Sequence, residues 1–334
     1  MDQHILIAVI LMAVGFVLTI KGGDWFVDAA IWVADVTNIP KILVGATIVS
    51  LCTTLPELLV STFAVASGTP DMGVGNAVGS IICNTSLILG ISITFLPSVV
   101  SRKSFWIKSL FLIGSMLLLG FFAYNRNISW IEGSVLFVLL ILYFFVNVRT
   151  AMNARNGKEI HESVDTTKKT VTKNLLKFLV GVVFIIIGAR LLVNNGVIIA
   201  KALGVSDQII GLTVVALGTS LPELITTVSA VIKREFTLSI GNILGANILN
   251  ILMIISTCSV MTNDGLEIAM QNIPLVKNAV PQALYLDLPV ALLVSLVVIV
   301  PALITGRFKR WQGITLLSFY VLYIGYLSLD LIIA

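Results

Sequence analysis

A long internal repeat limits the folds that are open to this chain. The segment from Gly45 to Gly90 recurs 166 residues later, from Gly211 to Ser256. At that offset 17 of 46 positions are identical, and the alignment needs no gap. A chain that carries two such copies is expected to fold as two related halves.

The identical positions gather in two short motifs that contain polar residues. The first, Thr-x-Leu-Pro-Glu-Leu, begins at Thr53 and again at Thr219. The second, Gly-Asn-x-x-Gly, begins at Gly75 and again at Gly241. Each copy therefore places one glutamate beside a proline inside an otherwise apolar stretch. Two such acids suggest one shared cation site.

The composition indicates a helical membrane protein. Of the 334 residues, 57% are hydrophobic and 11% are charged, and the mean hydropathy is +1.04. Soluble domains carry about 25% charged residues, and about 20 apolar residues suffice to cross a bilayer as a helix. We expect an all-α polytopic fold with ten transmembrane helices. The spans are predicted at about 4–34, 41–66, 72–97, 105–123, 129–148, 173–200, 206–232, 237–260, 286–304 and 311–331.

A polar stretch divides these spans into two halves of five. We predict a first half at 1–148, a cytoplasmic linker at 149–172 and a second half at 173–334. The repeat copies, 45–90 and 211–256, lie one in each half. Because each half contains an odd number of spans, the second copy is inverted relative to the first.

Basic residues predict the orientation. With the N-terminus outside, 16 of the 21 Lys and Arg residues fall on the cytoplasmic side. This bias follows the positive-inside rule, so the pI near 9.0 reports topology and not nucleic-acid binding. We expect a multi-pass protein of the plasma membrane. The sixteen are Lys41, Arg102, Lys103, Lys108, the seven from Arg149 to Lys177, Lys233, Arg234, Arg307, Lys309 and Arg310.

Two acids lie near the middle of apolar spans, Glu57 and Glu223. Insertion scales put the cost of a charge at that depth at roughly 2.5–3.5 kcal/mol. Each acid therefore needs a proton, a cation or a basic partner. Pairing with Lys21 or Arg190 is the structural alternative to a cation site.

The proline beside each acid frees backbone oxygen donors. Pro56 lacks an N–H and its ring clashes with the carbonyl of Cys52, and Pro222 does the same to Gly218. Freed carbonyls at membrane depth are tolerated only where protein or a cavity satisfies them. We expect these carbonyls to lie beside the acids as cation ligands; a simple proline kink is the alternative.

Helical spacing adds further oxygens, because residues four apart share a face. Apart from Ala246, the side chains at these positions are hard oxygen donors of the kind that calcium accepts, about 6–8 at a time. The sequence contains no cluster of His or Cys residues of the kind that binds zinc or copper, which argues against those metals. The sets are Thr53, Glu57 and Ser61 with Thr219, Glu223 and Thr227, and Asn76, Ser80 and Asn84 with Asn242, Ala246 and Asn250.

The two motifs, present twice in inverted halves, resemble the alpha-repeats of the cation/calcium antiporter superfamily, and most resemble the prokaryotic sodium/calcium exchangers. The resemblance covers the whole predicted layout. It implies a secondary antiporter, not an enzyme, that exchanges Na⁺ for Ca²⁺ by alternating access at a midplane two-glutamate site and has no cofactor. The ion ligands that it implies are Thr53, Thr54, Glu57, Ser80 and Asn84 with Thr219, Ser220, Glu223 and Asn250.

Three features depart from the family pattern. Ala246 stands where the family usually has serine, which leaves the number of sodium ions open. Asn250 stands where potassium-dependent members carry aspartate, which argues against potassium coupling. Gly79 and Gly245 stand where proton-coupled members carry glutamate, which argues against proton coupling.

Other functions also fit part of the pattern. A Ca²⁺/H⁺ or other cation/Ca²⁺ antiporter is the nearest alternative, and a cation channel is another, although no filter-like loop is evident. An intramembrane hydrolase would need a nucleophile–base pair or a His-rich metal site, and we expect His4 and His161 to lie outside the membrane core. We expect Ca²⁺, Na⁺ and the lipid bilayer as partners, a monomer, and no nucleic acid.

Overall fold

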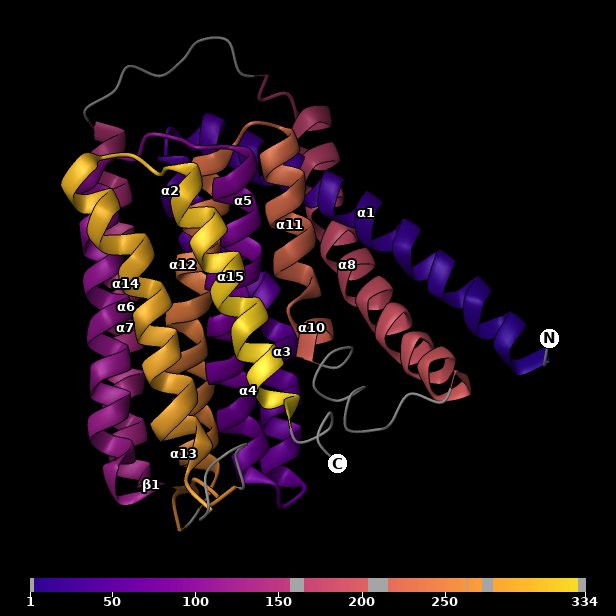
Figure 1. Cartoon of the computed structure of the whole chain (residues 1–334). Helices are drawn as coiled ribbons and strands as arrows, with labels where there is room; N and C mark the ends of the chain where they lie inside the picture. The colour runs from indigo at the N-terminus through magenta and orange to yellow at the C-terminus, as the bar shows by residue number, and fades with distance from the viewer. Residues whose placement is uncertain (1–2, 157–164, 204–215, 263, 272–278, 330–334) are drawn as a thin grey trace.

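The chain folds almost entirely into helices (Figure 1). The structure is a computed structural model that describes residues 3–156, 165–203, 216–262, 264–271 and 279–329. Up to residue 156, the elements are α1 (Gln3–Thr37), α2 (Lys41–Val44), the π-helical turn η1 (Gly45–Val49), α3 (Ser50–Ala66), α4 (Pro70–Ile82), the π-helical turn η2 (Cys83–Ile88), α5 (Leu89–Phe95), α6 (Arg102–Phe122), the 3₁₀ turn η3 (Ala123–Asn125), β1 (Asn127–Ile128) and α7 (Trp130–Asn156).

The second part of the chain repeats this pattern of long helices. The predicted span 206–232 falls partly outside the described residues, and its described part contains two short helices, α10 and α11. The elements are α8 (Lys168–Ala202), α10 (Ala216–Thr219), α11 (Leu221–Ile232), α12 (Phe236–Leu249), the π-helical turn η5 (Asn250–Ile255), α13 (Ser256–Met261), β2 (Leu266–Glu267), the π-helical turn η6 (Ala283–Asp287), α14 (Leu288–Thr305) and α15 (Arg310–Leu327).

Eight helical segments of the described chain are long and apolar enough to cross a membrane. They agree with eight of the predicted spans to within a few residues at most ends; α6, predicted at 105–123, runs from Arg102 to Phe122. The helices α11 and α15 are not among the eight. The chain is therefore a multi-pass helical membrane protein.

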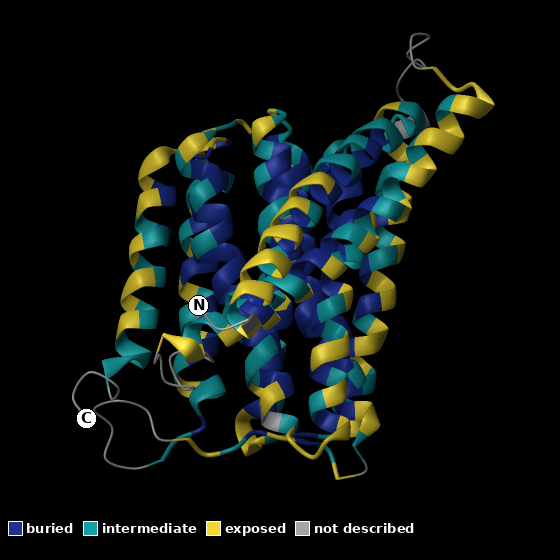
Figure 2. Cartoon of the chain, turned by 90° about the vertical axis from the view of Figure 1, so that its right-hand side faces the viewer, coloured by how far each residue is buried: buried dark blue, intermediate teal, exposed yellow. Residues whose placement is uncertain are grey.

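The helices form a core with an oblique pair beside it (Figure 1). In the most apolar stretch of α12 and α13, 89% of the residues are buried, against 22% in α1 and in α8. Figure 2 shows buried residues along the inner helices and exposed ones on the outside. Phe16, Phe121 and Phe145 are more than half exposed, as expected of side chains that face lipid.

The oblique pair, α1 and α8, packs antiparallel through four glycines. Gly15 faces Gly188, and Gly22 faces Gly181. A Cβ atom on any of the four would lie 2.7–2.8 Å from the carbonyl oxygen of its partner, so only glycine permits this approach. Gly15 and Gly181 are 166 residues apart, as are Gly22 and Gly188. Each glycine therefore meets the repeat counterpart of the other glycine on its own helix.

The connections between helices sort to two ends of the bundle (Figure 1). At one end, Lys41 pairs with Glu235 at 2.5 Å, and Val99 bridges Arg307. At the other end, β1 pairs antiparallel with β2. Lys108, which the pattern of basic residues assigns to the cytoplasmic side, lies within α6 and is buried, at 1% exposed, so its side chain is not at a loop surface.

Candidate functional site

The first predicted acid lies on a buried face of α3. Thr53, Glu57 and Ser61 are 2%, 0% and 0% exposed, as their four-residue spacing predicts. Thr54, beside them, is fully buried. The helix continues through Pro56 without a break, so this proline lies inside one continuous helix.

The second copy differs at its proline. Helix α10 ends at Thr219, and Ser220, with φ −89° and ψ 7°, separates it from α11. Pro222 lies in the first turn of α11, where a missing N–H leaves no hydrogen bond unmade. Glu223 and Ser220 are buried, and Thr219 is half-buried. The helix break therefore lies directly beside the second acid.

Both predicted asparagines lie at the start of π-helical turns. The turn η2 begins one residue before Asn84, and η5 begins at Asn250. Both side chains are buried. Asparagine side chains compete with the backbone for hydrogen bonds, and π-helical turns in α-helices are frequent at functional sites. The repeat motif contained no signal for these turns.

The two halves cross so that the predicted residues come together. Helix α3 packs against η5 and α11 packs against η2, so each acid-bearing helix meets the asparagine turn of the other half. Helices α3 and α11 also touch, and the carboxyl groups of Glu57 and Glu223 are close enough to interact. Thr53 and Thr54 also lie close to Glu223. Ser80, 4% exposed, lies on α4, which packs against α3 and η5.

Buried atoms without a hydrogen-bond partner gather at these positions. Both carboxylate oxygens of Glu57 and of Glu223 lack a partner among the described residues. The other unpaired atoms at predicted positions are Thr54 Oγ1, Asn84 Oδ1, Ser220 Oγ, Thr227 Oγ1, and the side-chain oxygen and nitrogen of Asn250. Buried polar atoms in native proteins are nearly always paired. The unpaired oxygens around two acids make this position a candidate cation site.

A hydrogen-bond chain fixes the orientation of Asn84. Its Nδ2 donates to Asn247 Oδ1 at 3.1 Å, and Asn247 Nδ2 donates to Thr85 Oγ1 at 2.8 Å. This arrangement leaves Asn84 Oδ1 available as a ligand. The repeat did not point to Asn247, because its equivalent position in the first copy is Ile81, which is not polar.

A second chain orients Thr53. Its hydroxyl lies 3.3 Å from both Ser50 O and Asn242 Oδ1, to either of which it can donate. Asn242 Nδ2 donates to Thr226 Oγ1 at 3.1 Å. Because the proton of Thr53 is directed to these acceptors, a lone pair of its oxygen remains free to face a cation.

The donors around the acids suit a hard cation. No described basic side chain forms an ion pair with Glu57 or Glu223, so the alternative in which Lys21 or Arg190 neutralises them finds no support. Within the described ranges no three His, Cys, Asp or Glu residues form a group that could hold a metal ion. The unpaired atoms are mainly carboxylate, hydroxyl and amide oxygens, which calcium and sodium prefer.

The basic residues instead pair at one end of the bundle. Lys233, directly after α11, pairs with Asp28 at 2.5 Å and with Asp24 at 2.9 Å, and Lys177 of α8 pairs with Asp28 at 3.0 Å. Burial lowers the pKa of Lys233, but the two aspartates outweigh it and raise the pKa above the ordinary lysine value. These pairs tie α1 to α8 and to the core.

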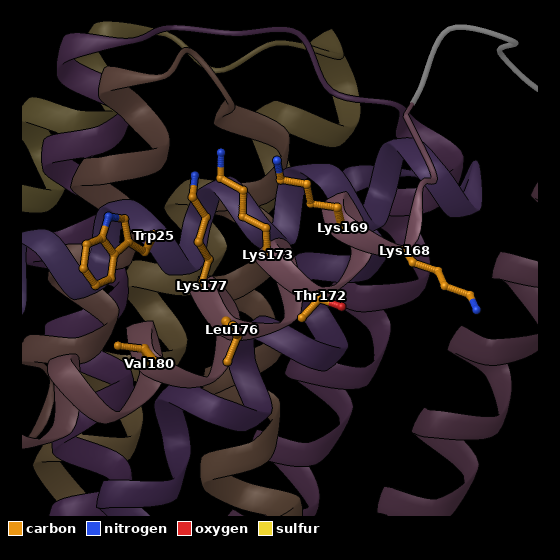
Figure 3. A pocket seen from close by; sticks show the side chains of 8 residues that line it. All are labelled: Trp25, Lys168, Lys169, Thr172, Lys173, Leu176, Lys177 and Val180. Atoms are coloured by element: carbon orange, nitrogen blue, oxygen red, sulfur yellow. The ribbon is translucent and has the colours of Figure 1, made fainter.

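One cavity lies apart from the acids. It has a volume of about 710 Å³ and lies against Trp25 and the first turns of α8 (Figure 3). The positive charges of its lysine side chains repel a cation, so this cavity is not a cation site. A second cavity, of about 320 Å³, reaches Ser80 and Thr219. The lysines that line the first are Lys168, Lys169, Lys173 and Lys177.

Comparison with known proteins identifies the family of this chain. Residues 7–149 and 173–329 match the family described as sodium/calcium exchanger protein. An uncharacterised membrane protein of Methanocaldococcus jannaschii is 32% identical over 94% of this chain and 96% of its own length. The sodium/calcium exchanger MaX1 of Methanosarcina acetivorans is 28% identical over 94% of this chain and 97% of its own.

Solved structures of the sodium–calcium exchanger NCX_Mj share the fold. A crystal soaked with 10 mM Na⁺ and no Ca²⁺ gives a TM-score of 0.80 at 31% identity, covering 97% of this chain and 99% of that one. A crystal soaked with Na⁺ and Sr²⁺ gives 0.79 at 29% identity, covering 96% and 99%. The chain therefore belongs to the sodium/calcium exchanger family, whose members are ion transporters and not enzymes.

Proposed function

We propose that the chain exchanges sodium for calcium across a membrane, with Glu57 and Glu223 sharing one site. The observation that carries the proposal is the meeting of two fully buried carboxylates, one from each half, whose oxygens lack partners. Two unneutralised buried charges are costly, and a bound cation removes that cost. Relatives named as sodium/calcium exchangers support the same cargo.

The proposed site uses oxygen ligands only. Two carboxylates neutralise one Ca²⁺, and its remaining ligands, to a total of about 6–8, come from hydroxyl and amide groups. Sodium ions use the same oxygens, so calcium or sodium is bound but never both sets. This exclusion couples the two fluxes. The ligands are Glu57, Glu223, Thr53, Thr54, Ser80, Asn84, Thr219, Ser220 and Asn250.

Exchange also requires that the site open to one side at a time. We infer that α1 and α8 move together against the core to achieve this. Two features support the inference: the glycine crossing holds the pair together, and both helices are far less buried than the core helix α12. Sliding of packed helices is an established route to such transitions.

For the membrane layout we propose ten spans in two inverted halves, residues 1–148 and 173–334, joined by a cytoplasmic linker at 149–172. The N-terminus is outside, the membrane is the plasma membrane, and the chain acts as a monomer. The reciprocal contacts of repeat-related glycines support the two-fold arrangement. The sorting of connections to two ends, with most basic residues at one, supports the orientation.

Transport by proteoliposomes tests the site. Sodium-loaded vesicles diluted into sodium-free medium should take up calcium. Glu57→Gln or Glu223→Gln should each reduce this uptake by at least about 100-fold, because removing one member of a buried charge set costs about 3–5 kcal/mol. Glu267→Gln, at an exposed acid, is the matched control and should transport normally. Normal uptake by either site variant would refute the shared site.

The same vesicles separate the alternative functions. Calcium uptake driven by a pH gradient in the absence of sodium would indicate proton coupling. Calcium flux that needs no counter-ion would indicate a channel. Uptake that requires internal sodium is the result that the proposal expects.

A further inference from the structure

A cavity leads from one end of the bundle to the proposed site. It has a volume of about 320 Å³ and lies between one face of α4 and one face of α15. Along α4 it runs from Met72 to Ser80 and beyond, and eight residues of helix span roughly 12 Å. Ser80 and Thr219, both proposed ligands, are among the residues that line it. At about 30 Å³ per molecule, it has room for roughly ten waters.

Asp287 is an acid in the wall of this cavity and is not one of the proposed ligands. It is 5% exposed and lies at the end of η6. Its Oδ1 accepts hydrogen bonds from the Tyr323 hydroxyl at 2.9 Å and from Gln282 Nε2 at 3.3 Å. All three side chains line the cavity. An acid, an amide and a phenol are thus held together on the path to the site.

A purely structural role does not account for Asp287. It lies inside the continuous helix formed by η6 and α14, with helical φ −70° and ψ −47°, so it does not cap a helix end. No described basic group lies within ion-pair distance of it. A carboxylate offers about four acceptor positions, and its two partners fill only part of them. Its negative charge is therefore available to a cation in the cavity.

We propose that Asp287, with the oxygen atoms of Gln282 and Tyr323, forms a waypoint at which a partly hydrated calcium ion pauses before it reaches Glu57 and Glu223. The role rests on the proposed exchange function. A fixed negative charge inside a low-dielectric cleft raises the local cation concentration and the rate of arrival. The effect is larger for a divalent ion than for sodium, because the attraction scales with charge.

Charge removal tests the waypoint. In sodium-loaded membrane vesicles, Asp287→Asn should raise the half-saturating calcium concentration by roughly three- to tenfold, with the maximal rate within twofold of the unsubstituted chain. Raising ionic strength with choline chloride should shrink the difference, since salt screens the charge. The shift should occur for calcium supplied at the face to which the cavity opens. Glu267→Gln, an exposed acid at the same end of the bundle, is the control and should change nothing.

A charge swap guards against misfolding of the variant. Gln282→Glu combined with Asp287→Asn returns one carboxylate to the same place, because the two side chains are hydrogen-bonded, and should restore the half-saturating concentration. An unchanged half-saturating concentration in Asp287→Asn would overturn the waypoint, as would a lowered maximal rate that neither the swap nor ionic strength affects. If the unsubstituted chain shows no sodium-driven uptake, the proposed function itself fails, which is a separate result.

Discussion

The glycine crossing of α1 and α8 can be tested with the smallest possible side chain. A Cβ on Gly188 would lie 2.7 Å from the Gly15 carbonyl oxygen, and a Cβ on Gly15 would lie 2.8 Å from the Gly188 carbonyl oxygen. Ordinary van der Waals contact begins at 3.4 Å, so alanine at either position must separate the two backbones by 0.6–0.7 Å (3.4 − 2.8 and 3.4 − 2.7). Backbone atoms cannot swing aside as a flexible side chain can.

The cost of that separation follows from known overpacking effects. Inserted methyl groups in packed interiors cost about 1–3 kcal/mol, while replacing glycine by alanine within a helix returns up to about 1 kcal/mol. Gly114→Ala in α6 is the matched control, because nothing lies within 4 Å of its added Cβ. Gly15→Ala and Gly188→Ala should therefore be about 1–3 kcal/mol less stable than the control.

Thermal unfolding of purified protein in detergent measures this ranking. Gly15→Ala and Gly188→Ala should lower the Tm, and Gly114→Ala should leave it equal or higher. Gly181→Ala should resemble Gly15→Ala, because the two positions are related by the repeat and their Cβ atoms meet equivalent carbonyls. If alanine at the crossing raises the Tm as much as it does at Gly114, the two helices do not approach as described.

Two further substitutions probe the supports of the site and of α1. Asn247→Ala should raise the half-saturating calcium concentration by about fivefold or more, since it leaves Asn84 without its acceptor at a cost of about 1–3 kcal/mol. Asn147→Ala, at a buried asparagine bonded within its own helix, is the control and should leave that concentration unchanged. Equal effects of the two substitutions would refute the orienting role of Asn247. A double-mutant cycle with Lys233→Met and Asp28→Asn should give a coupling of about 0.2–1 kcal/mol, because both side chains are partly exposed. The raised pKa of Lys233 keeps its ammonium group charged up to pH 10.5, the ordinary value for lysine. The coupling is therefore lost only in stronger base or in acid strong enough to protonate Asp28, and a coupling that disappears between pH 6 and 8 would contradict the ion pair.

Helix positions and the burial of both acids were predictable from the sequence. Apolar stretches of about 20 residues have few alternatives in a bilayer, which is why α6 agrees with its prediction to within three residues. Glu57 and Glu223 could be singled out as candidates for one shared site because neither acid has a basic residue nearby in the sequence and both lie in repeated motifs.

The features that the repeat does not share were not predictable. Pro56 lies within one continuous helix, while Pro222 follows a break at Ser220, although the surrounding motif is the same. Asn247 has no counterpart in the first copy, and Asp287 finds its partner Tyr323 36 residues further along the chain. Such contacts depend on how distant helices pack, which local periodicity does not encode.

Anomalous diffraction from crystals soaked with Sr²⁺ tests the central claim most directly. The account predicts a peak between Glu57 and Glu223, with oxygens of both carboxylates at close to the 2.3–2.6 Å typical of calcium ligands, and loss of the peak in Glu223→Gln. A peak elsewhere in the bundle, with both carboxylates turned away from it, would contradict the account.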